Sequence, residues 1–435
     1  MNFEKSKALQ RVSHRIIPGG CHTYAKGDDQ YPELAPAFLS KGKGSHVWDV
    51  DGNEYIEYGM GLRAVTLGHA YDPVVQAAYR QMLKGNNYTR PAAIEVECAE
   101  KVANLIHDAE MVKFAKNGSD VNNAAVKLAR AYTGRDRIAI CADHPFFSVD
   151  DWFIGTTPMA AGIPKVVRDL TVKFRYNDPE SVQSLFDQYP GEIACIIMEP
   201  EKNDPPVDNF LHEAQRICRK HGALFILDEM ITGFRVDLGG AQKLHKIVPD
   251  LSTFGKAMGN GFAISALVGR KEIMELGGLH HDKERVFLLS TTHGAEGHAL
   301  AAAIETMRIY EREPVIEHLY RQGQRLIDGI KKTVEENRLD GYFGTAGKPC
   351  NLVFYTRDQE KKPSQPYRTL FLQETIKRGL IMPSLVVSYS HTDEDIDRTI
   401  DGINEALKIY RKALDEGVEK FLIGPPSKPS MRQYN

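Results

Sequence analysis

The sequence predicts an α/β protein whose main domain is a mostly parallel sheet with helices on both faces. Apolar, strand-like runs alternate with helical runs through the middle of the chain, and a long helix-rich stretch at residues 299–337 follows them. The chain has 435 residues, more than one simple core accommodates, so two closely joined lobes are expected.

The first predicted element is a hairpin near the N-terminus. Residues 45–58, SHVWDVDGNEYIEY, contain β-forming residues on both sides of Asp-Gly, which is a strong hairpin signal. Helical spacing follows at residues 72–83 and 92–106. The hairpin is expected to belong to a small lobe.

The middle of the chain predicts the sheet. Strand-like runs and helical runs alternate there, with strands at 111–115, 137–141, 193–198 and 224–227 and helices at 122–132 and 211–221. In such a sheet, ligands bind beyond the carboxyl ends of the strands. The remainder, with a strand-like run near Asn351 and a helical run at 394–416, predicts a second α+β lobe. We expect residues 60–310 to form the large domain, and 1–59 with 311–435 the small one.

Composition indicates a small substrate. The chain has 55 Lys and Arg against 58 Asp and Glu with no long run of either sign, which disfavours nucleic acid or a membrane surface as partner. The N-terminus lacks the continuous apolar core of a secretory signal, so a cytoplasmic location is expected. The six cysteines are scattered without CxxC spacing, which favours reduced thiols.

Two residues carry a chemical hypothesis. Asp228 ends the strand-like run FILD, although a role as a cap or turn residue also explains an acid there. Lys256 lies in STFGKAMGNG, where Gly255 and Gly259 let the backbone approach a ligand; a solvated surface lysine is the alternative. In the functional interpretation, Lys256 forms a Schiff base with pyridoxal 5'-phosphate (PLP), and Asp228 pairs with its ring nitrogen.

A possible phosphate site precedes a predicted helix. The turn KNGSD, residues 116–120, leads directly into the helical run VNNAAVKLAR. Exposed N–H groups and the positive end of the helix dipole would attract a phosphate at Gly118 and Ser119. Helix capping explains the same residues about equally well when the turn is considered alone.

Taken together, the motifs resemble those of the class III aminotransferases of PLP fold type I, nearest to glutamate-1-semialdehyde 2,1-aminomutase. The similarity runs from about Pro18 to about Tyr410, in the order IPGG, KGKGSHVWDVDGNEYIEY, LGHA, NGSD, MEP, LDEMITGFR, PDLSTFGKAMGNGF and SHTDEDID. It implies a large PLP-binding domain with a mostly parallel sheet of about seven strands. It also implies a smaller α+β domain built from both termini.

The resemblance assigns cofactor roles by position. Gly118 and Ser119 match the phosphate-binding turn, Asp228 matches the partner of the ring nitrogen, and Lys256 matches the Schiff-base lysine. Met230 matches a side chain that packs on one face of the cofactor.

Three further positions match the family less closely. Phe146, in the altered stretch HPFFS, is our choice for the ring that stacks on the other face of the cofactor. Glu199 matches a glutamate near the cofactor, although the residues after it differ from the family pattern. Thr291 or Thr292 would close the phosphate site of a partner subunit, which implies a homodimer with shared active sites.

No metal is expected. His293 and His298 flank Glu296, but this arrangement lacks the HExxH spacing of zinc enzymes and a third ligand is not evident.

The substrate is a more open question. The aminomutases carry an arginine for the substrate carboxylate in the region that here reads CHTYAKGDD, and Lys26 does not offer the same planar fork. Tyr24, Lys26 and Arg63 are the candidate substrate-binding residues; an ordinary structural role for Arg63 is the alternative.

The resemblance favours a PLP-dependent aminotransferase that acts on two small molecules, an amino donor and a carbonyl acceptor. The variants HTYAKGDD, HPFFSVDDWF and STTHGAEGH together resemble a subgroup that aminates sugar or cyclitol carbonyls. This resemblance implies a sugar-like or cyclitol-like acceptor, with L-glutamate as the expected donor. Glutamate-1-semialdehyde 2,1-aminomutase or a PLP-dependent racemase remains the alternative. A non-enzymatic scaffold or regulator is disfavoured because Lys256 and Asp228 are both present.

Overall fold

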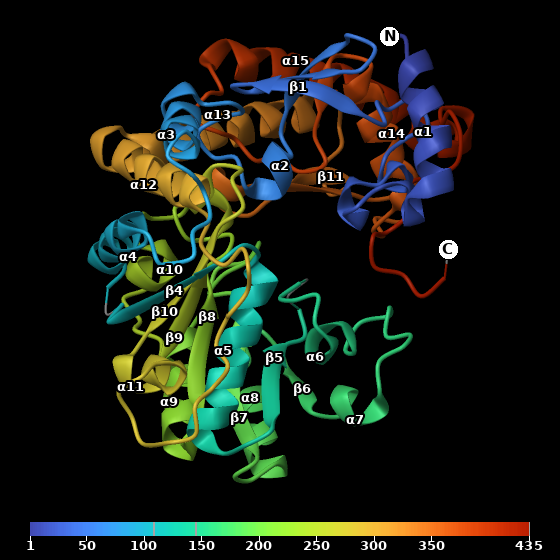
Figure 1. The fold of residues 1–435 in the computed structure, drawn as a ribbon. Helices are drawn as coiled ribbons and strands as arrows, with labels where there is room; N and C mark the ends of the chain where they lie inside the picture. Colours follow the sequence, from blue (N-terminus) through green and yellow to red (C-terminus); the bar gives the residue numbers. More distant parts are fainter. Residues whose placement is uncertain (108, 144–145, 435) are drawn as a thin grey trace. The chain divides into compact units, whose positions relative to one another are not determined.

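Seven strands between Asp72 and Ile316 form one sheet in the computed structural model of the chain (Figure 1). The structure describes residues 1–107, 109–143 and 146–434. Two structural units share the chain: Asp72–Ile316 is one, and Met1–Tyr71 together with Glu317–Asn435 is the other.

The large sheet has the order β4-β10-β9-β8-β7-β5-β6. β10 runs antiparallel to both of its neighbours, and the other paired strands are parallel. This confirms the predicted fold class. The strands are β4 (Met111–Ala115), β5 (Arg137–Cys141), β6 (Thr171–Phe174), β7 (Ile193–Met198), β8 (Leu224–Asp228), β9 (Leu251–Phe254) and β10 (Ser265–Gly269).

Helices cover this sheet. Every residue of β7, β8, β9 and β10 is buried, which explains why β7 and β8 read as continuous apolar runs. Helix α5 packs against β7, β8, β9 and β10, and α9 packs against β8. The helices of this part of the chain are α3 (Asp72–Met82), α4 (Ala93–Leu105), α5 (Gly118–Thr133), α6 (Asp151–Ile154), α7 (Lys165–Arg168), α8 (Pro179–Gln188), α9 (Phe210–His221), α10 (Gly240–Leu244), α11 (Lys271–Met274) and α12 (Gly297–Arg312).

The second unit contains a four-stranded sheet of order β1-β2-β3-β13 and a separate pair, β11 and β12. The predicted hairpin is present as β2 and β3, and Gly52 in its turn has φ 92°. The strands are β1 (Leu39–Lys43), β2 (His46–Asp49), β3 (Glu54–Glu57), β11 (Phe343–Ala346), β12 (Val353–Thr356) and β13 (Leu380–Ile381). The helices are α1 (Glu4–Ile16), α2 (Met60–Arg63), α13 (Val315–Glu336), α14 (Gln365–Ile376) and α15 (Asp393–Glu416).

Short 3₁₀ helices link these elements: η1 (Pro18–Gly20), η2 (Tyr24–Lys26), η3 (Asp28–Gln30), η4 (Lys256–Gly259), η5 (Glu275–Gly277), η6 (Pro349–Asn351) and η7 (Val418–Lys420). In the described part of the chain, no helix is both long and apolar enough to cross a bilayer. All six cysteines are free thiols, and burial raises the pKa of Cys98 and of Cys195 to about 12.

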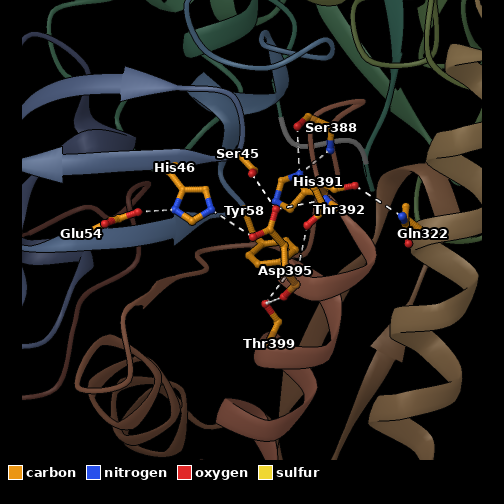
Figure 2. A network of polar contacts seen from close by, with 10 residues as sticks. All are labelled: Ser45, His46, Glu54, Tyr58, Gln322, Ser388, His391, Thr392, Asp395 and Thr399. Carbon is orange, nitrogen blue, oxygen red and sulfur yellow. Dashed lines mark hydrogen bonds and ion pairs between the residues drawn. The ribbon is translucent and has the colours of Figure 1, made fainter.

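A buried polar network joins β2 to the first turn of α15 (Figure 2). The carboxylate of Asp395 accepts hydrogen bonds from the hydroxyl of Ser45 at 2.8 Å and the N–H of Thr392 at 3.0 Å. Its other oxygen lies 3.0 Å from Nε2 of His46. These bonds hold the pKa of Asp395 well below its usual range although burial opposes ionisation. The SHTDEDID motif therefore ties the end of the chain to the N-terminal hairpin.

We expect Asp395→Ala to lower the free energy of unfolding by about 2–3 kcal/mol at neutral pH, because Ser45 and Thr392 lose a buried charged acceptor. Since the folded-state pKa is depressed, this contribution is present above an unfolded pKa of about 4 and is lost as the pH falls through the folded value. Urea unfolding at a series of pH values measures it, with the exposed Asp397→Ala as control. If the free energies of unfolding of Asp395→Ala and wild type differ as much in acid as at neutral pH, this account is contradicted.

Candidate active site

The predicted cofactor residues follow strands that end at one edge of the large sheet. Strands β4, β5, β7, β8 and β9 all point the same way, so their carboxyl ends meet there. Asp228 is the last residue of β8, Glu199 follows β7, and Lys256 comes two residues after β9. Gly118 follows β4 and Phe146 follows β5. This edge is where a doubly wound sheet places its ligands.

Asp228 is held in one orientation inside the protein. Its side chain is 2% exposed, and Oδ1 accepts the backbone N–H of Met230 at 2.8 Å. Oδ2 accepts a hydrogen bond from Nδ2 of Asn122 at 2.7 Å. Burial raises the pKa of Asp228, while the charge of Lys256 and the two hydrogen bonds act in the opposite direction. The carboxylate is thus desolvated but supported, as a partner for a cationic ring requires.

Lys256 begins the 3₁₀ helix η4 with φ 47°, a left-handed conformation that costs a lysine free energy. Strained residues of this kind cluster at functional sites. Gly255, the residue before it, has an extended backbone with φ 178°, which any residue can adopt. Glycine is therefore required there by the space available for a side chain and not by the backbone conformation.

Met230 packs between two glycines. A Cβ placed on Gly118 or on Gly255 would lie 2.8 Å from the sulfur of Met230, closer than atoms tolerate. The two glycines belong to the predicted phosphate turn and to the lysine segment, respectively. Their lack of side chains therefore allows Met230 to sit beside both segments.

The predicted phosphate turn opens α5, a helix of 16 residues. The carboxylate of Asp120 accepts the N–H of Asn117 at 2.9 Å, and the hydroxyl of Ser265 donates to the carbonyl of Asn117 at 2.8 Å. These bonds fix the entry into the helix. The N–H groups of Gly118 and Ser119 lie in the first turn, where a helix offers no acceptor and its dipole favours an anion.

The two phenylalanines after β5 have different surroundings. Phe147 is buried, and its carbonyl accepts a hydrogen bond from Asn122 at 2.7 Å. Phe146 remains 42% exposed and meets Phe153 edge to face. Of the pair, Phe146 is the ring that a ligand can reach. His144 and Pro145 of the same motif lie outside the described residues.

The acids beside Asp228 are buried too. Glu199 is 5% exposed, and Glu201 is 2.8 Å from Nε2 of His245. Glu229 accepts the N–H groups of Ala241 at 2.8 Å and Gln242 at 2.6 Å, at the start of α10. Burial raises the pKa of Glu229 to about 7. Glu229 thus anchors the segment after β8, a role that its place in the LDEMITGFR motif did not reveal.

The loop that carries Thr291 and Thr292 is tied to the phosphate turn. Both threonines are exposed, and the carbonyl of Thr292 accepts a hydrogen bond from Asn87 at 3.0 Å. In the same loop, Glu296 forms an ion pair of 2.6 Å with Lys116, the residue before Asn117. The hydrogen bond from Lys116 is the main cause of the lowered pKa of Glu296.

The three predicted substrate residues belong to the other structural unit. Nε of Arg63 donates to Oδ1 of Asn351 at 2.9 Å, so part of its guanidinium serves the structure. Tyr24 is 58% exposed, and Lys26 lines a cavity of about 780 Å³ within this unit.

Arg63 ends an unusual turn. Met60, Gly61, Leu62 and Arg63 all have positive φ, between 42° and 68°, although only one of them is glycine. Gly61 and Leu62 also line the cavity that Lys26 borders. Positive φ at three residues other than glycine is strained, and strain of this kind is enriched at functional sites.

In the described residues, no group of three or more metal-binding side chains is present. The chemistry at the sheet edge is instead a buried acid, a strained lysine and a helix N-terminus, the set that a ring-bearing phosphate cofactor needs.

Solved structures place this fold in a class. The fold is that of PLP-dependent transaminases: the chain superimposes on the PLP-containing FumI protein of Sphingopyxis sp. MTA144 with a TM-score of 0.87 and 28% identity, covering 94% of this chain and 97% of that one. The chain belongs to the class III aminotransferase family, whose profile matches residues 26–407.

Curated relatives match almost the whole length of the chain. Glutamate-1-semialdehyde 2,1-aminomutase of Acetivibrio thermocellus is 33% identical over 93% of this chain and 98% of its own. The 3-aminobutyryl-CoA aminotransferase of Cloacimonas acidaminovorans is 31% identical over 95% of this chain and 99% of its own. The protein is a PLP-dependent aminotransferase, and its cofactor is pyridoxal 5'-phosphate.

Proposed function

We propose that Lys256 holds PLP as a Schiff base and that Asp228 pairs with its ring nitrogen, in an enzyme that aminates the carbonyl of a small sugar-like or cyclitol-like substrate with L-glutamate as donor. The observation that carries the cofactor assignment is the buried, doubly hydrogen-bonded carboxylate of Asp228 beside the charge of Lys256.

PLP, when bound, supplies an electron-poor ring that accepts the electrons of the broken C–H bond of the substrate. Asp228 keeps the ring nitrogen protonated, because a buried carboxylate stabilises a cation beside it. The amine of Lys256 would hold PLP and, once freed by the substrate amine, would act as the base that takes the proton from the substrate carbon and as the acid that returns a proton.

The remaining cofactor residues hold the ring and the phosphate. The first turn of α5, with Gly118 and Ser119, binds the phosphate. Met230 packs on one face of the ring and the exposed Phe146 stacks on the other. Glu199, which follows β7 beside the strand that ends in Asp228, is the proposed acid near the ring.

The phosphate site also requires a partner subunit. The exposed Thr291 or Thr292 reaches the phosphate of the partner, so the enzyme is a homodimer with active sites at the interface. Size determination in solution tests this point directly, because a monomer that retains full activity contradicts it.

The sugar-like substrate is proposed from the resemblance of the variant motifs, and a missing side chain argues against the aminomutase. Residues 16–62 contain no arginine, whereas the aminomutases hold the substrate carboxylate with an arginine in this region. Arg63, on the strained turn that borders the cavity, together with Tyr24 and Lys26, is the candidate contact for hydroxyl-bearing or anionic substrates.

Glutamate-1-semialdehyde 2,1-aminomutase is the second candidate, because the relative at 33% identity carries that name. An aminomutase needs neither a separate donor nor an acceptor, so the two candidates are separable by assay. A racemase shares this property.

The test is a pair of measurements. We expect the purified protein to absorb visible light through bound PLP, and L-glutamate to convert it to the amine form of the cofactor and release 2-oxoglutarate. Oxidised sugars and cyclitols, with an aldehyde or ketone, are then screened as acceptors that restore the original spectrum. Turnover only with glutamate semialdehyde would exclude the sugar proposal. A coloured protein whose visible spectrum does not change with L-glutamate would exclude L-glutamate as the donor.

A further inference from the structure

Asn122 is a fully buried amide in the first half of α5. Asparagine is a poor residue for a helix interior, and a buried amide is costly unless its polar atoms are paired. Here they are paired. Nδ2 donates to the carbonyl of Phe147 and to Oδ2 of Asp228, each at 2.7 Å, and Oδ1 accepts from the hydroxyl of Thr253 at 2.6 Å.

The three partners of Asn122 come from three separate segments, and each is a proposed cofactor residue or lies within three residues of one. Asp228 is the proposed partner of the ring nitrogen, Phe147 follows the stacking residue Phe146, and Thr253 precedes Lys256 by three positions. One amide therefore touches the segments of three cofactor contacts. Rotating the amide by half a turn would face its oxygen toward two acceptors, so only one orientation is stable.

We propose that Asn122 is a positioning residue that aims the carboxylate of Asp228 at the ring nitrogen of PLP and holds the segment that carries Phe146. This rests on the proposed roles of Asp228 and Lys256. The N–H groups of Asn122 and Met230 each bind a different oxygen of Asp228, which prevents rotation of the carboxylate. The remaining lone pairs of the Asp228 carboxylate then have a fixed direction. The hydroxyl of Thr253, which donates to Oδ1 of Asn122, fixes the orientation of the amide.

The first test compares Asn122→Asp with Asn123→Asp, the same change one residue along the helix at a partly exposed position. In Asn122→Asp, the introduced carboxyl group would face both the carboxylate of Asp228 and the carbonyl of Phe147. We expect the pH midpoint of the visible absorption of bound PLP to move by about one unit or more. We also expect kcat to fall about tenfold to a hundredfold, with the KM for the amino donor changed by less than about threefold.

A merely structural role would leave the pH midpoint where it is in the wild type. Asn122→Asp and Asn123→Asp with equal midpoints and equal kcat would overturn the proposal. In the protein without PLP, the melting temperature of Asn122→Asp should fall further below that of Asn123→Asp as pH rises, because two carboxylates then ionise side by side.

Thr253→Val keeps the proposal testable if Asn122→Asp does not fold. It removes only the hydroxyl that binds Oδ1 of Asn122, in a strand position that suits valine. The pH midpoint of Thr253→Val should also move, by a smaller amount, and an unchanged midpoint overturns the proposal. The visible absorption of bound PLP in wild type and in Lys256→Ala separates the two proposals. If wild type lacks this absorption, or Lys256→Ala keeps it, the proposed function fails and the role of Asn122 fails with it. If only wild type has it, the measurements above test the role of Asn122 alone.

Discussion

Lys256→Ala should lower the rate of amino transfer by at least about 10⁴-fold, because one side chain both binds the cofactor covalently and moves the proton. Alanine also has a Cβ, so the left-handed backbone at φ 47° stays as strained as in the wild type, and the loss reports the amine itself. The measurement is steady-state turnover together with the visible spectrum of the protein mixed with PLP.

The matched control for this prediction is Lys271→Ala, which removes an exposed lysine at the start of α11 in the same structural unit. Its turnover and spectrum should equal those of wild type. Lys256→Ala protein that retains turnover within about tenfold of wild type would exclude Lys256 as the residue that holds the cofactor.

Asp228→Asn should lower kcat by about 10²-fold to 10³-fold, because a neutral amide no longer favours a protonated ring nitrogen. The structure adds a second cost. Asn122 and Met230 each donate to a different oxygen of Asp228, so an amide nitrogen at either position would face a donor. This mispairing acts to lower the stability of the variant, so its melting temperature should be measured beside its kcat.

Relief of a buried charge acts in the opposite direction on stability. Burial raises the pKa of Asp228, so its ionised form is costly and Asn removes that cost. The net change in melting temperature shows which effect prevails. Asp136→Asn, at an exposed turn between α5 and β5, is the control and should leave both quantities unchanged. An Asp228→Asn protein with wild-type kcat would remove Asp228 from the cofactor site.

Much of the fold was predictable from local patterns. The runs at β7 and β8 are apolar over almost their whole length because both faces are covered, and the sequence shows this directly. The hairpin of β2 and β3 is marked by Asp-Gly, and α15 is marked by its polar entry SHTDEDID. Strands β6 and β10 and helix α1 were not predicted, because they are short or carry charges among their apolar residues.

The sequence by itself determined the chemistry of the main candidates. Asp228 ends a buried strand and Lys256 lies among glycines, and both patterns are local, so they are visible without a structure. The order of the motifs then indicated the family that the comparisons show.

Only the tertiary structure decided which residues support that chemistry. Asn122, Thr253 and Asp228 are far apart in the sequence, yet hydrogen bonds of 2.6 and 2.7 Å join them. Asn122 lies on the buried stripe of α5, the one sequence signal that marked it, but its partners depend on how the strands are ordered. Strand order is set by packing over long separations, and a pattern of neighbouring residues does not contain it.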